Sequence, residues 1–308
     1  MAAWVGIPAL SATADTIIYM YYGNPSAPAN TAANAHGTWD SNYLGVYHLD
    51  DNAANTTVVN SIGSNNGTNI ANTSTKTATG EEGIANTALT YNGSSDYTSI
   101  NGLASSISSG SVTYSIWFKP SSTINSGSGI TNLIALGDTS STNDITFAFN
   151  GDPCNTFSTG ELYFGLDTNN SCVTADTIST QTSWISGTWY YAVGTFSTTS
   201  GMKLYINGIA VATNANTSRG TTASTHLLIA NYQVNLTHIF NGILDEARIS
   251  NTARSVPWID TEYNNQVAPA SFYSVGNEET DIYAPTMAQV MRHGEWFSAE
   301  GAVQPFVF

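Results

Sequence analysis

The strongest constraint on the fold is a series of short segments, rich in β-branched and aromatic residues, that recur along most of the chain. Turn-forming clusters of Gly, Asn, Ser and Asp separate them at a spacing of about 10 to 20 residues. The clearest segments are 112–119, 145–149, 189–196, 203–211 and 241–249. Strands joined by turns rather than by helices predict an all-β sandwich of two antiparallel sheets, not a series of βαβ units.

Local signals refine this prediction. Asn207-Gly208 lies between two apolar runs and predicts a tight hairpin. Ser255 is a good helix-capping residue, and it predicts one short helix near 255–265. Residues 51–88 are polar and rich in Gly and Asn, so we expect a long loop that carries function or wraps a site.

Changes in composition divide the 308-residue chain into three regions. Residues 1–40 combine the strand-like segment 16–22 with a linker rich in Ala, Asn and Pro. Residues 41–279 contain the regular strands, and 280–308 form a tail with large apolar side chains of its own. We expect 41–279 to be the sandwich. The two end regions are the parts expected to contact neighbouring molecules, including further copies of the chain.

The net charge of the chain bears on which kinds of molecule it can bind. It has 22 acidic and 7 basic residues, which gives a net charge of −15. So few basic groups cannot neutralise the phosphates of a nucleic-acid site, and an acidic surface is not attracted to anionic lipids. No apolar stretch approaches the ~20 residues that cross a bilayer. We therefore expect neither a nucleic-acid partner nor a membrane.

The cysteines and the N-terminus bear on where the protein works. Cys154 and Cys172 lie close in sequence, and the composition is typical of extracellular proteins, so we predict one disulfide between them. The alternative is two unpaired buried thiols. Residues 1–8 lack the basic and apolar regions of a signal peptide. We expect an extracellular location or display on a virus particle released by lysis.

Short motifs follow one another in a defined order between residues 43 and 279. They are 45–51 (GVYHLDD), 59–68 (VNSIGSNNGT), 91–97 (YNGSSDY), 115–119 (SIWFK), 204–208 (LYING) and 240–254 (FNGILDEARISNTAR). In order and spacing they resemble the laminin G-like modules of bacterial and archaeal surface proteins, within the concanavalin A-like lectin/glucanase superfamily. The resemblance implies a jelly-roll sandwich that binds ligands at its surface.

The same resemblance implies a structural calcium ion between the loop around Asn60 and the strand that contains Asp245. Carboxylate and amide oxygens suit calcium, and the candidate ligands are Asn60, Asn66 and Asp245. Asn60 replaces the Asp that is usual in the family, and the lost charge is expected to weaken the site. The alternative is that Asp245 only caps backbone groups or pairs with Arg248 or Arg254.

A sugar site would need an exposed aromatic side chain with amides or carboxylates nearby. Trp184 and Tyr232, with loop asparagines, are the candidates. The alternative is that these rings belong to the core, as we expect for Trp117 and Trp189.

Catalysis is not expected. Glucanases of this superfamily carry their acids as a Glu-x-Asp-x-(x)-Glu string on one strand, which places the carboxyl groups on a single face. This chain has no such string, and Glu161 is isolated. Asp245 and Glu246 are adjacent, and neighbours on a regular strand point to opposite faces.

Two functional interpretations follow. The first is a virion decoration or fibre-type accessory protein, because 291–297 and 304–308 resemble the C-terminal ends of some phage structural proteins. Residues 13–26 also resemble the end of an uncharacterised domain that often precedes laminin G-like modules. The alternative is a cell-surface adhesin or carbohydrate-binding module of a bacterium or archaeon. Both interpretations predict a non-catalytic protein that binds a glycan or another surface ligand.

Overall fold

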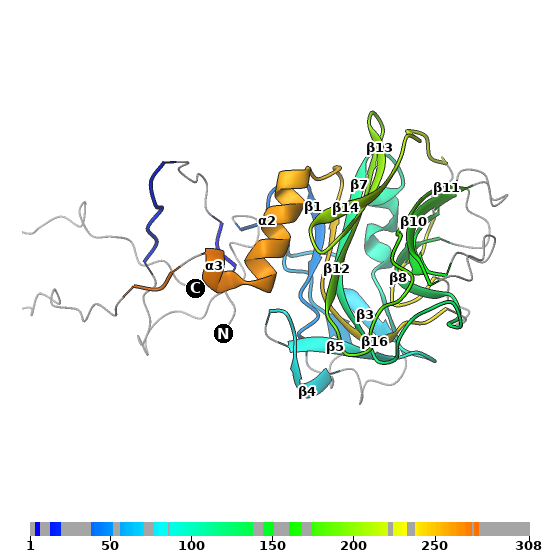
Figure 1. Ribbon diagram of the computed structural model, residues 1–308, viewed down its shortest axis with the longest axis horizontal. Helices are drawn as coiled ribbons and strands as arrows, with labels where there is room; N and C mark the ends of the chain where they lie inside the picture. The colour runs from blue at the N-terminus through cyan, green and yellow to red at the C-terminus, as the bar shows by residue number, and fades with distance from the viewer. Residues whose placement is uncertain are drawn as a thin grey trace, which may run out of the picture.

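Two antiparallel sheets packed face to face form the body of the protein (Figure 1). The computed structural model describes residues 4–6, 13–19, 38–51, 56–70, 77–85, 87–137, 144–150, 160–167, 174–220, 224–232, 238–272 and 274–276. The predicted all-β sandwich is confirmed. Within the described ranges, no helix has the length and apolar character needed to span a bilayer.

The first sheet is built around one long strand. Its members in the described residues are β1 (Tyr43–Tyr47), β4 (Thr77–Glu82), β5 (Thr87–Asn92), β7 (Val112–Pro120), β12 (Tyr190–Ser197), β13 (Gly201–Ile206), β14 (Ile209–Asn214) and β16 (Asn241–Ser250). Their order is β14-β13-β12-β7-β16-β5-β4. Strand β16 pairs with β7 on one side, and on the other with β5 in its first half and β1 in its second.

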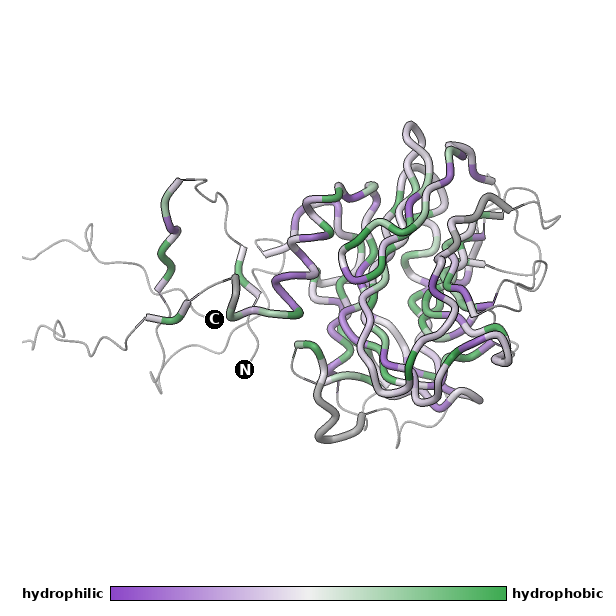
Figure 2. Tube along the Cα trace, viewed as in Figure 1, coloured by the Kyte–Doolittle hydropathy of each residue, from purple (hydrophilic) through white to green (hydrophobic). Residues whose placement is uncertain are grey.

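The second sheet faces the first across the core. The described members are β2 (Thr57–Val58), β3 (Gly67–Ile70), β6 (Tyr97–Ser99), β8 (Thr131–Leu136), β9 (Ile145–Phe149), β10 (Leu162–Asp167), β11 (Thr174–Ile178) and β15 (Leu227–Ile229). They are arranged in the order β11-β10-β9-β8-β15-β6-β3-β2. Alternate residues of both sheets are apolar and meet between the sheets, so that side chains such as Phe118, Phe149 and Phe164 are fully buried. Figure 2 shows the hydrophobic residues concentrated in the strands.

The helices within the described residues are a 3₁₀ helix, η2 (Asn101–Ile107), and the α-helices α2 (Val256–Val267) and α3 (Pro269–Phe272). Ser255 caps α2, because its hydroxyl accepts a hydrogen bond from Trp258 N at 3.4 Å. The predicted helix near 255–265 is therefore confirmed, although η2 and α3 were not foreseen.

Helix α2 covers the outer face of the first sheet (Figure 1). Ile259 and Tyr263 of the helix pack there against four side chains of the sheet, Trp117, Tyr191, Val193 and Tyr205. Trp117 is buried, as predicted, but it lies under α2 rather than between the sheets. Its indole N–H donates to Gln266 Oε1 at 2.6 Å, which fixes the end of the helix on the sheet.

The hairpin prediction is also confirmed. Asn207 and Gly208 connect β13 to β14 with φ values of 50° and 80°. Two successive positive φ values match the twist of the flanking strands, and Asn-Gly adopts them at low cost.

Two predictions about local structure were wrong. Residues 51–88 contain β2, β3, β4 and the start of β5 rather than one long loop. In the described part of the predicted strand 16–22, no strand forms, and the side chains of Ile17, Ile18 and Tyr19 are exposed. β-propensity by itself does not make a strand without a hydrogen-bonded neighbour.

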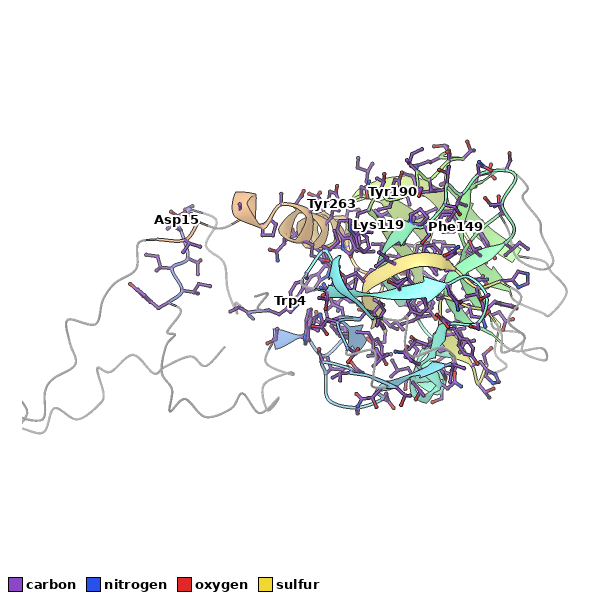
Figure 3. The ribbon with its side chains drawn as sticks, turned by 90° about the horizontal axis from the view of Figure 1, so that it is seen from below. Trp4, Asp15, Lys119, Phe149, Tyr190 and Tyr263 are labelled. Atoms are coloured by element: carbon purple, nitrogen blue, oxygen red, sulfur yellow. The ribbon has the colours of Figure 1, made fainter. Side chains whose placement is uncertain are left out.

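The N-terminal region contacts the sandwich at several points. Trp4 packs against Trp39 and stacks on His48, with ring centroids 5.4 and 5.7 Å apart. Figure 3 shows Trp4 beside the sandwich and Asp15 away from it. The tail 280–308 lies outside the described residues, and so do Cys154 and Cys172. The disulfide and the assembly role of the tail therefore stay predictions.

Asp51 gives the stability of the protein an expected pH dependence. Its carboxylate accepts a hydrogen bond from Val59 N at 3.0 Å, but burial dominates and raises the pKa of Asp51 to about 6, from an ordinary value of 3.8. The folded state therefore binds this proton more tightly than the unfolded state, and the stability that it contributes is lost as the pH rises from about 4 to about 6.

We expect Asp51→Asn to flatten the fall in melting temperature over this pH range, measured by thermal unfolding in a pH series. Asp15→Asn is the matched control, because the Asp15 side chain is exposed. An unchanged slope in Asp51→Asn would contradict the assignment of this proton to Asp51.

Candidate functional site

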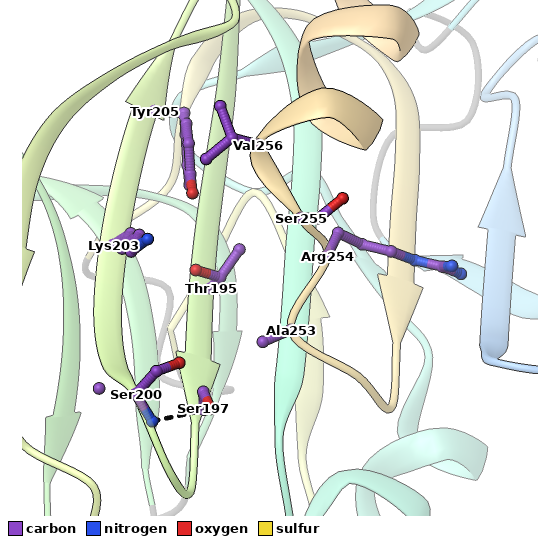
Figure 4. A pocket seen from close by; sticks show the side chains of 10 residues that line it. Thr195, Ser197, Ser200, Lys203, Tyr205, Ala253, Arg254, Ser255 and Val256 are labelled. Carbon is purple, nitrogen blue, oxygen red and sulfur yellow. Dashed lines mark hydrogen bonds between the residues drawn. The ribbon is translucent and has the colours of Figure 1, made fainter.

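A polar pocket lies on the outer face of the first sheet, between the β12–β13 hairpin and the segment that joins β16 to α2 (Figure 4). Its volume is about 150 Å³. Typical small-molecule sites enclose roughly 300–1,000 Å³, so this pocket fits one ring or one substituent of a larger ligand. The residues that line it are Thr195, Ser197, Ser200, Gly201, Lys203, Tyr205, Ala253, Arg254, Ser255 and Val256.

The floor of the pocket follows from strand register. Thr195 on β12 lies directly opposite Lys203 on β13, so their side chains are neighbours on the same face of the sheet. Tyr205 lies two residues after Lys203 and shares that face. In Figure 4 the hydroxyl end of the Tyr205 ring points toward Lys203 and Thr195.

Residues 253–256 form the opposite wall, and the start of this segment is tied to the sheet. The hydroxyl of Thr113 donates to Thr252 O at 2.7 Å and accepts from Arg254 N at 2.9 Å. The guanidinium of Arg254 points away from the pocket, toward Asp40 (Figure 4). This wall therefore presents backbone and small side chains, and Lys203 supplies the cation of the pocket.

Two hydroxyls of otherwise buried residues open into this pocket without a partner. Thr195 is 3% exposed and Tyr205 is 1% exposed. Among the described residues, neither hydroxyl forms a hydrogen bond. Two unpartnered hydroxyls that face one pocket are available to a ligand, because each can donate and accept a hydrogen bond. Burial also raises the pKa of Tyr205, which keeps its phenol protonated and able to donate.

The turn at the end of the pocket is held by hydrogen bonds within itself. The hydroxyl of Ser197 accepts hydrogen bonds from the backbone N–H groups of Thr199 and Ser200, at 3.2 and 3.1 Å. These bonds fix the β12–β13 turn and hold Ser200 at the rim of the pocket (Figure 4).

An arginine–aromatic cluster lies on the other side of the β16–α2 connection. It consists of Arg248, Arg254, Trp4, Trp39, Tyr43 and Trp258. The Arg254 guanidinium lies 4.2 Å from the Tyr43 ring centroid and 4.3 Å from that of Trp258. The Arg248 guanidinium lies 4.5 and 4.9 Å from the rings of Trp4 and Trp39. These cation–π contacts join the N-terminal region to β16 and α2.

Carboxylates neutralise both arginines. Arg248 bonds Glu246 at 2.7 Å and also bonds Glu262. Burial opposes the charge of Arg248, but these two carboxylates outweigh it and raise its pKa. The hydrogen bond from Arg254 lowers the pKa of Asp40. Since both cations are committed to these pairs, the cluster is a structural link rather than an open site.

The predicted calcium ligands are engaged with the backbone, in separate places. Asn60 Oδ1 accepts from Val46 N at 2.9 Å, and Asn66 Oδ1 accepts from Asn60 N at 2.9 Å. These bonds hold the β2–β3 loop against β1. Asp245 Oδ2 instead accepts from Ile84 N at 2.6 Å, in the β4–β5 turn.

Asn60 and Asn66 are thus brought together, but no contact joins either of them to Asp245. Among the described residues, no group of three or more His, Cys, Asp or Glu side chains could hold a metal ion. Calcium binding stays a prediction.

The two predicted sugar-binding aromatics are buried. Trp184 is fully buried and its indole N–H donates to Gly160 O at 2.8 Å, so it cannot stack on a sugar. Tyr232 is 9% exposed and donates to Asp144 Oδ2 at 2.7 Å. Both rings complete the protein interior, because a large aromatic side chain gains most when it is fully packed. Trp189, predicted to be in the core, is only partly buried and lies under Lys119.

The prediction that Asp245 and Glu246 point to opposite faces was also wrong. Register with β7 shifts between Asp245 and Arg248, so that Glu246 lies in a β-bulge with a φ of 49°. A bulge turns successive side chains to the same side. Asp245 reaches Ile84 and Glu246 reaches Arg248, both on the outer face.

These two carboxyl groups are nevertheless closed off. Asp245 is 0% exposed and Glu246 is 1% exposed. Burial, together with the adjacent Glu246 carboxylate, raises the pKa of Asp245 well above its ordinary value. A glycosidase needs both acids to face a substrate, and in this structure neither can reach one.

The residues that line the pocket were not predicted from the sequence. The available signal was the alternation of polar residues at 195 and 197 and at 203 and 205, beside apolar residues that enter the core. That pattern places them on an outer face. It does not show that residues 253–256, far along the chain, close over them.

Comparisons with known proteins agree with this architecture. The family model Laminin_G_3, described as the concanavalin A-like lectin/glucanases superfamily, matches residues 92–260. No curated protein matches the chain.

Several solved structures are similar to this chain. Domain 4 of AbnA, an extracellular GH43 arabinanase from Geobacillus stearothermophilus solved in complex with arabinotriose, is 20% identical with a TM-score of 0.49, over 71% of this chain and 96% of that one. The receptor-binding domain of botulinum neurotoxin C/D mosaic serotype is 15% identical with a TM-score of 0.51, over 74% and 52%. The binding domain of serotype C1 is 15% identical with a TM-score of 0.51, over 73% and 52%. The chain spans about half the length of these toxin chains.

Proposed function

Since the chain belongs to the concanavalin A-like lectin/glucanases superfamily, we propose that it is a non-catalytic glycan-binding module that works outside the cell, and that the β12–β13 pocket holds a sugar. The observation that carries this proposal is the pair of unpartnered hydroxyls of Thr195 and Tyr205, which face the pocket beside Lys203. Hydroxyl and ammonium groups complement the hydroxyls of a sugar, which both donate and accept hydrogen bonds.

The burial and pairing of two carboxyl groups, those of Asp245 and Glu246, support a non-catalytic role. Asp245 and Glu246 are buried, and Glu246 is held by Arg248 and His48, at 2.7 Å in each case. This arrangement supports a structural role for the two carboxyl groups in joining β16 to its neighbours.

Display on a virus particle is a separate part of the proposal. It rests on the sequence of 291–297 and 304–308, which lie outside the described residues. The alternative, a cell-surface adhesin, uses the same pocket, so the binding test below does not depend on which form of display is correct.

Removing the two pocket hydroxyls is expected to weaken glycan binding without a loss of stability. A glycan array would identify a ligand, and calorimetry would then compare the wild type with Thr195→Val and Tyr205→Phe. Each lost hydrogen bond is worth about 0.5–1.5 kcal/mol, so we expect affinity to fall by about two- to tenfold in each variant. The unfolding midpoint should hold, because neither hydroxyl has a partner among the described residues.

Tyr114→Phe is the matched control. Tyr114 is also fully buried, and its hydroxyl lacks a hydrogen bond to the described residues, but its ring lies between the sheets and not at the pocket. Its glycan affinity should equal that of the wild type. An array without any hit, or a glycan whose affinity is the same in all four proteins, would refute this assignment of the site.

A further inference from the structure

We propose that the β12–β13 pocket recognises the negatively charged group of an acidic sugar, either a carboxylate or a sulfate ester. This inference rests on the proposed function, because it names the class of glycan that the same site takes. Its physical basis is a cation without a counter-charge in a pocket rich in hydrogen-bond donors.

Lys203 differs from the other basic residues that the structure describes. Arg248 and Arg254 pair with carboxylates, Arg219 bonds backbone carbonyls, and Lys119 lies over an aromatic ring. In the described part of the chain, no carboxylate lies within ion-pair distance of Lys203. The chain as a whole has 22 acidic residues and 7 basic ones.

The donors of the pocket converge with this cation. Thr195 is the cross-strand partner of Lys203, and the Tyr205 hydroxyl enters from the next outward position on β13. An ammonium group has three donor protons and each hydroxyl has one. A carboxylate or sulfate offers several acceptor lone pairs in a small volume, so it can use these donors together.

The surroundings of the pocket also favour negative charge. None of its lining residues is acidic. Helix α2 begins at the rim with Val256, and its first turn contains no acidic residue, so the partial positive charge of the helix N-terminus is not neutralised there.

Between two sugars with the same ring shape, we expect the pocket to bind the negatively charged one more tightly. A neutral sugar forms ordinary hydrogen bonds with Thr195 and Tyr205 and leaves the ammonium without a counter-charge. An acidic sugar adds charge-assisted hydrogen bonds to Lys203, which are roughly twice as strong as neutral ones. We therefore expect the affinity for the acidic sugar to be about tenfold higher or more.

The test uses the full chain with ¹³C-labelled lysine, so that the ε-methylene signal of Lys203 reports on the pocket. Glucuronate, glucose 6-sulfate, glucose and inorganic sulfate are titrated separately at constant ionic strength. Saturable movement of the Lys203 signal by glucuronate or glucose 6-sulfate, with glucose at least about tenfold weaker, is the expected result. Comparison of the first two probes shows which charged group is preferred.

Variants separate the pocket from the rest of the surface. Lys203→Met assigns the signal and should abolish the preference for the acidic sugar in calorimetry, with an unchanged unfolding midpoint. Lys119→Met is the matched control and should leave that preference intact.

The outcomes that would contradict the inference can be told apart from those that would contradict the proposed function. Equal affinity for glucose and glucuronate would overturn the charge preference and leave the proposed glycan binding in place. Movement by inorganic sulfate but by none of the sugars would overturn the acidic sugar as ligand, and with it the proposed function of this pocket. If no probe moves the Lys203 signal, the inference fails, whereas a positive glycan array would then place glycan binding at another site.

Discussion

Replacing Arg248 by methionine is expected to destabilise the folded protein by about 3–5 kcal/mol. Arg248 is 3% exposed and neutralises two carboxylates, the buried Glu246 and the largely buried Glu262. The variant leaves both acids buried without their cation, and the desolvation of an unpaired charge is far more costly than the loss of one ordinary hydrogen bond. The cation–π contacts to Trp4 and Trp39 are lost as well.

Equilibrium unfolding in urea would measure this change in the free energy of unfolding. Arg219→Met is the matched control, because Arg219 bonds the backbone carbonyls of Ile107 and Gly110. Its expected loss is only about 1–2 kcal/mol. If Arg248→Met does not fold, Glu262→Gln gives the readout, since it weakens the same network from α2. A loss in Arg248→Met no larger than that in Arg219→Met would contradict the role of the buried ion network.

Replacing Trp184 by alanine is expected to cost about 3–5 kcal/mol of stability, because it leaves a large cavity in the interior. The Trp184 ring packs against Phe118, Phe149 and Tyr190, with centroid distances of 5.5, 5.4 and 5.1 Å. Its indole N–H also satisfies the carbonyl of Gly160. The substitution therefore removes packing and leaves one buried carbonyl without its donor.

The same variant separates a core tryptophan from a sugar-binding one. Urea unfolding would compare Trp184→Ala with Trp258→Ala, whose ring is 40% exposed and stacks on Arg254. We expect the second change to cost about 1 kcal/mol. The conservative variant Trp184→Phe should keep the glycan affinity of the wild type. If it instead lost affinity while it stayed folded, Trp184 would belong to the binding site after all.

The sequence could predict the features that depend on neighbours along the chain. Alternation of apolar and polar residues identified most of the strands, because successive side chains of a strand point to opposite faces. Asn207-Gly208 identified the hairpin and Ser255 the start of α2, because φ preference and capping are local properties. The ordered motifs between 43 and 279 identified the superfamily for the same reason, since they record the strands and their turns.

The candidate site could not be predicted in this way. Trp184 and Tyr232 were plausible surface aromatics in sequence, but burial depends on which strands pack over a residue. The directions of Asp245 and Glu246 depend on a bulge that arises from the register of β16 against β7. A shift of register by one residue reverses which side chains face outward, and no local pattern records that shift.

What the sequence alone determined is therefore the class of fold, the strands, the hairpin and the capped helix. Only the tertiary structure decided that residues 253–256 lie beside β12 and β13, and that Thr195 and Tyr205 open into the pocket between them. It also decided that Trp4 packs on Arg248, which lies far along the chain. The physical reason is that propensity, capping and alternation act over a few residues, whereas a pocket forms where distant segments pack together.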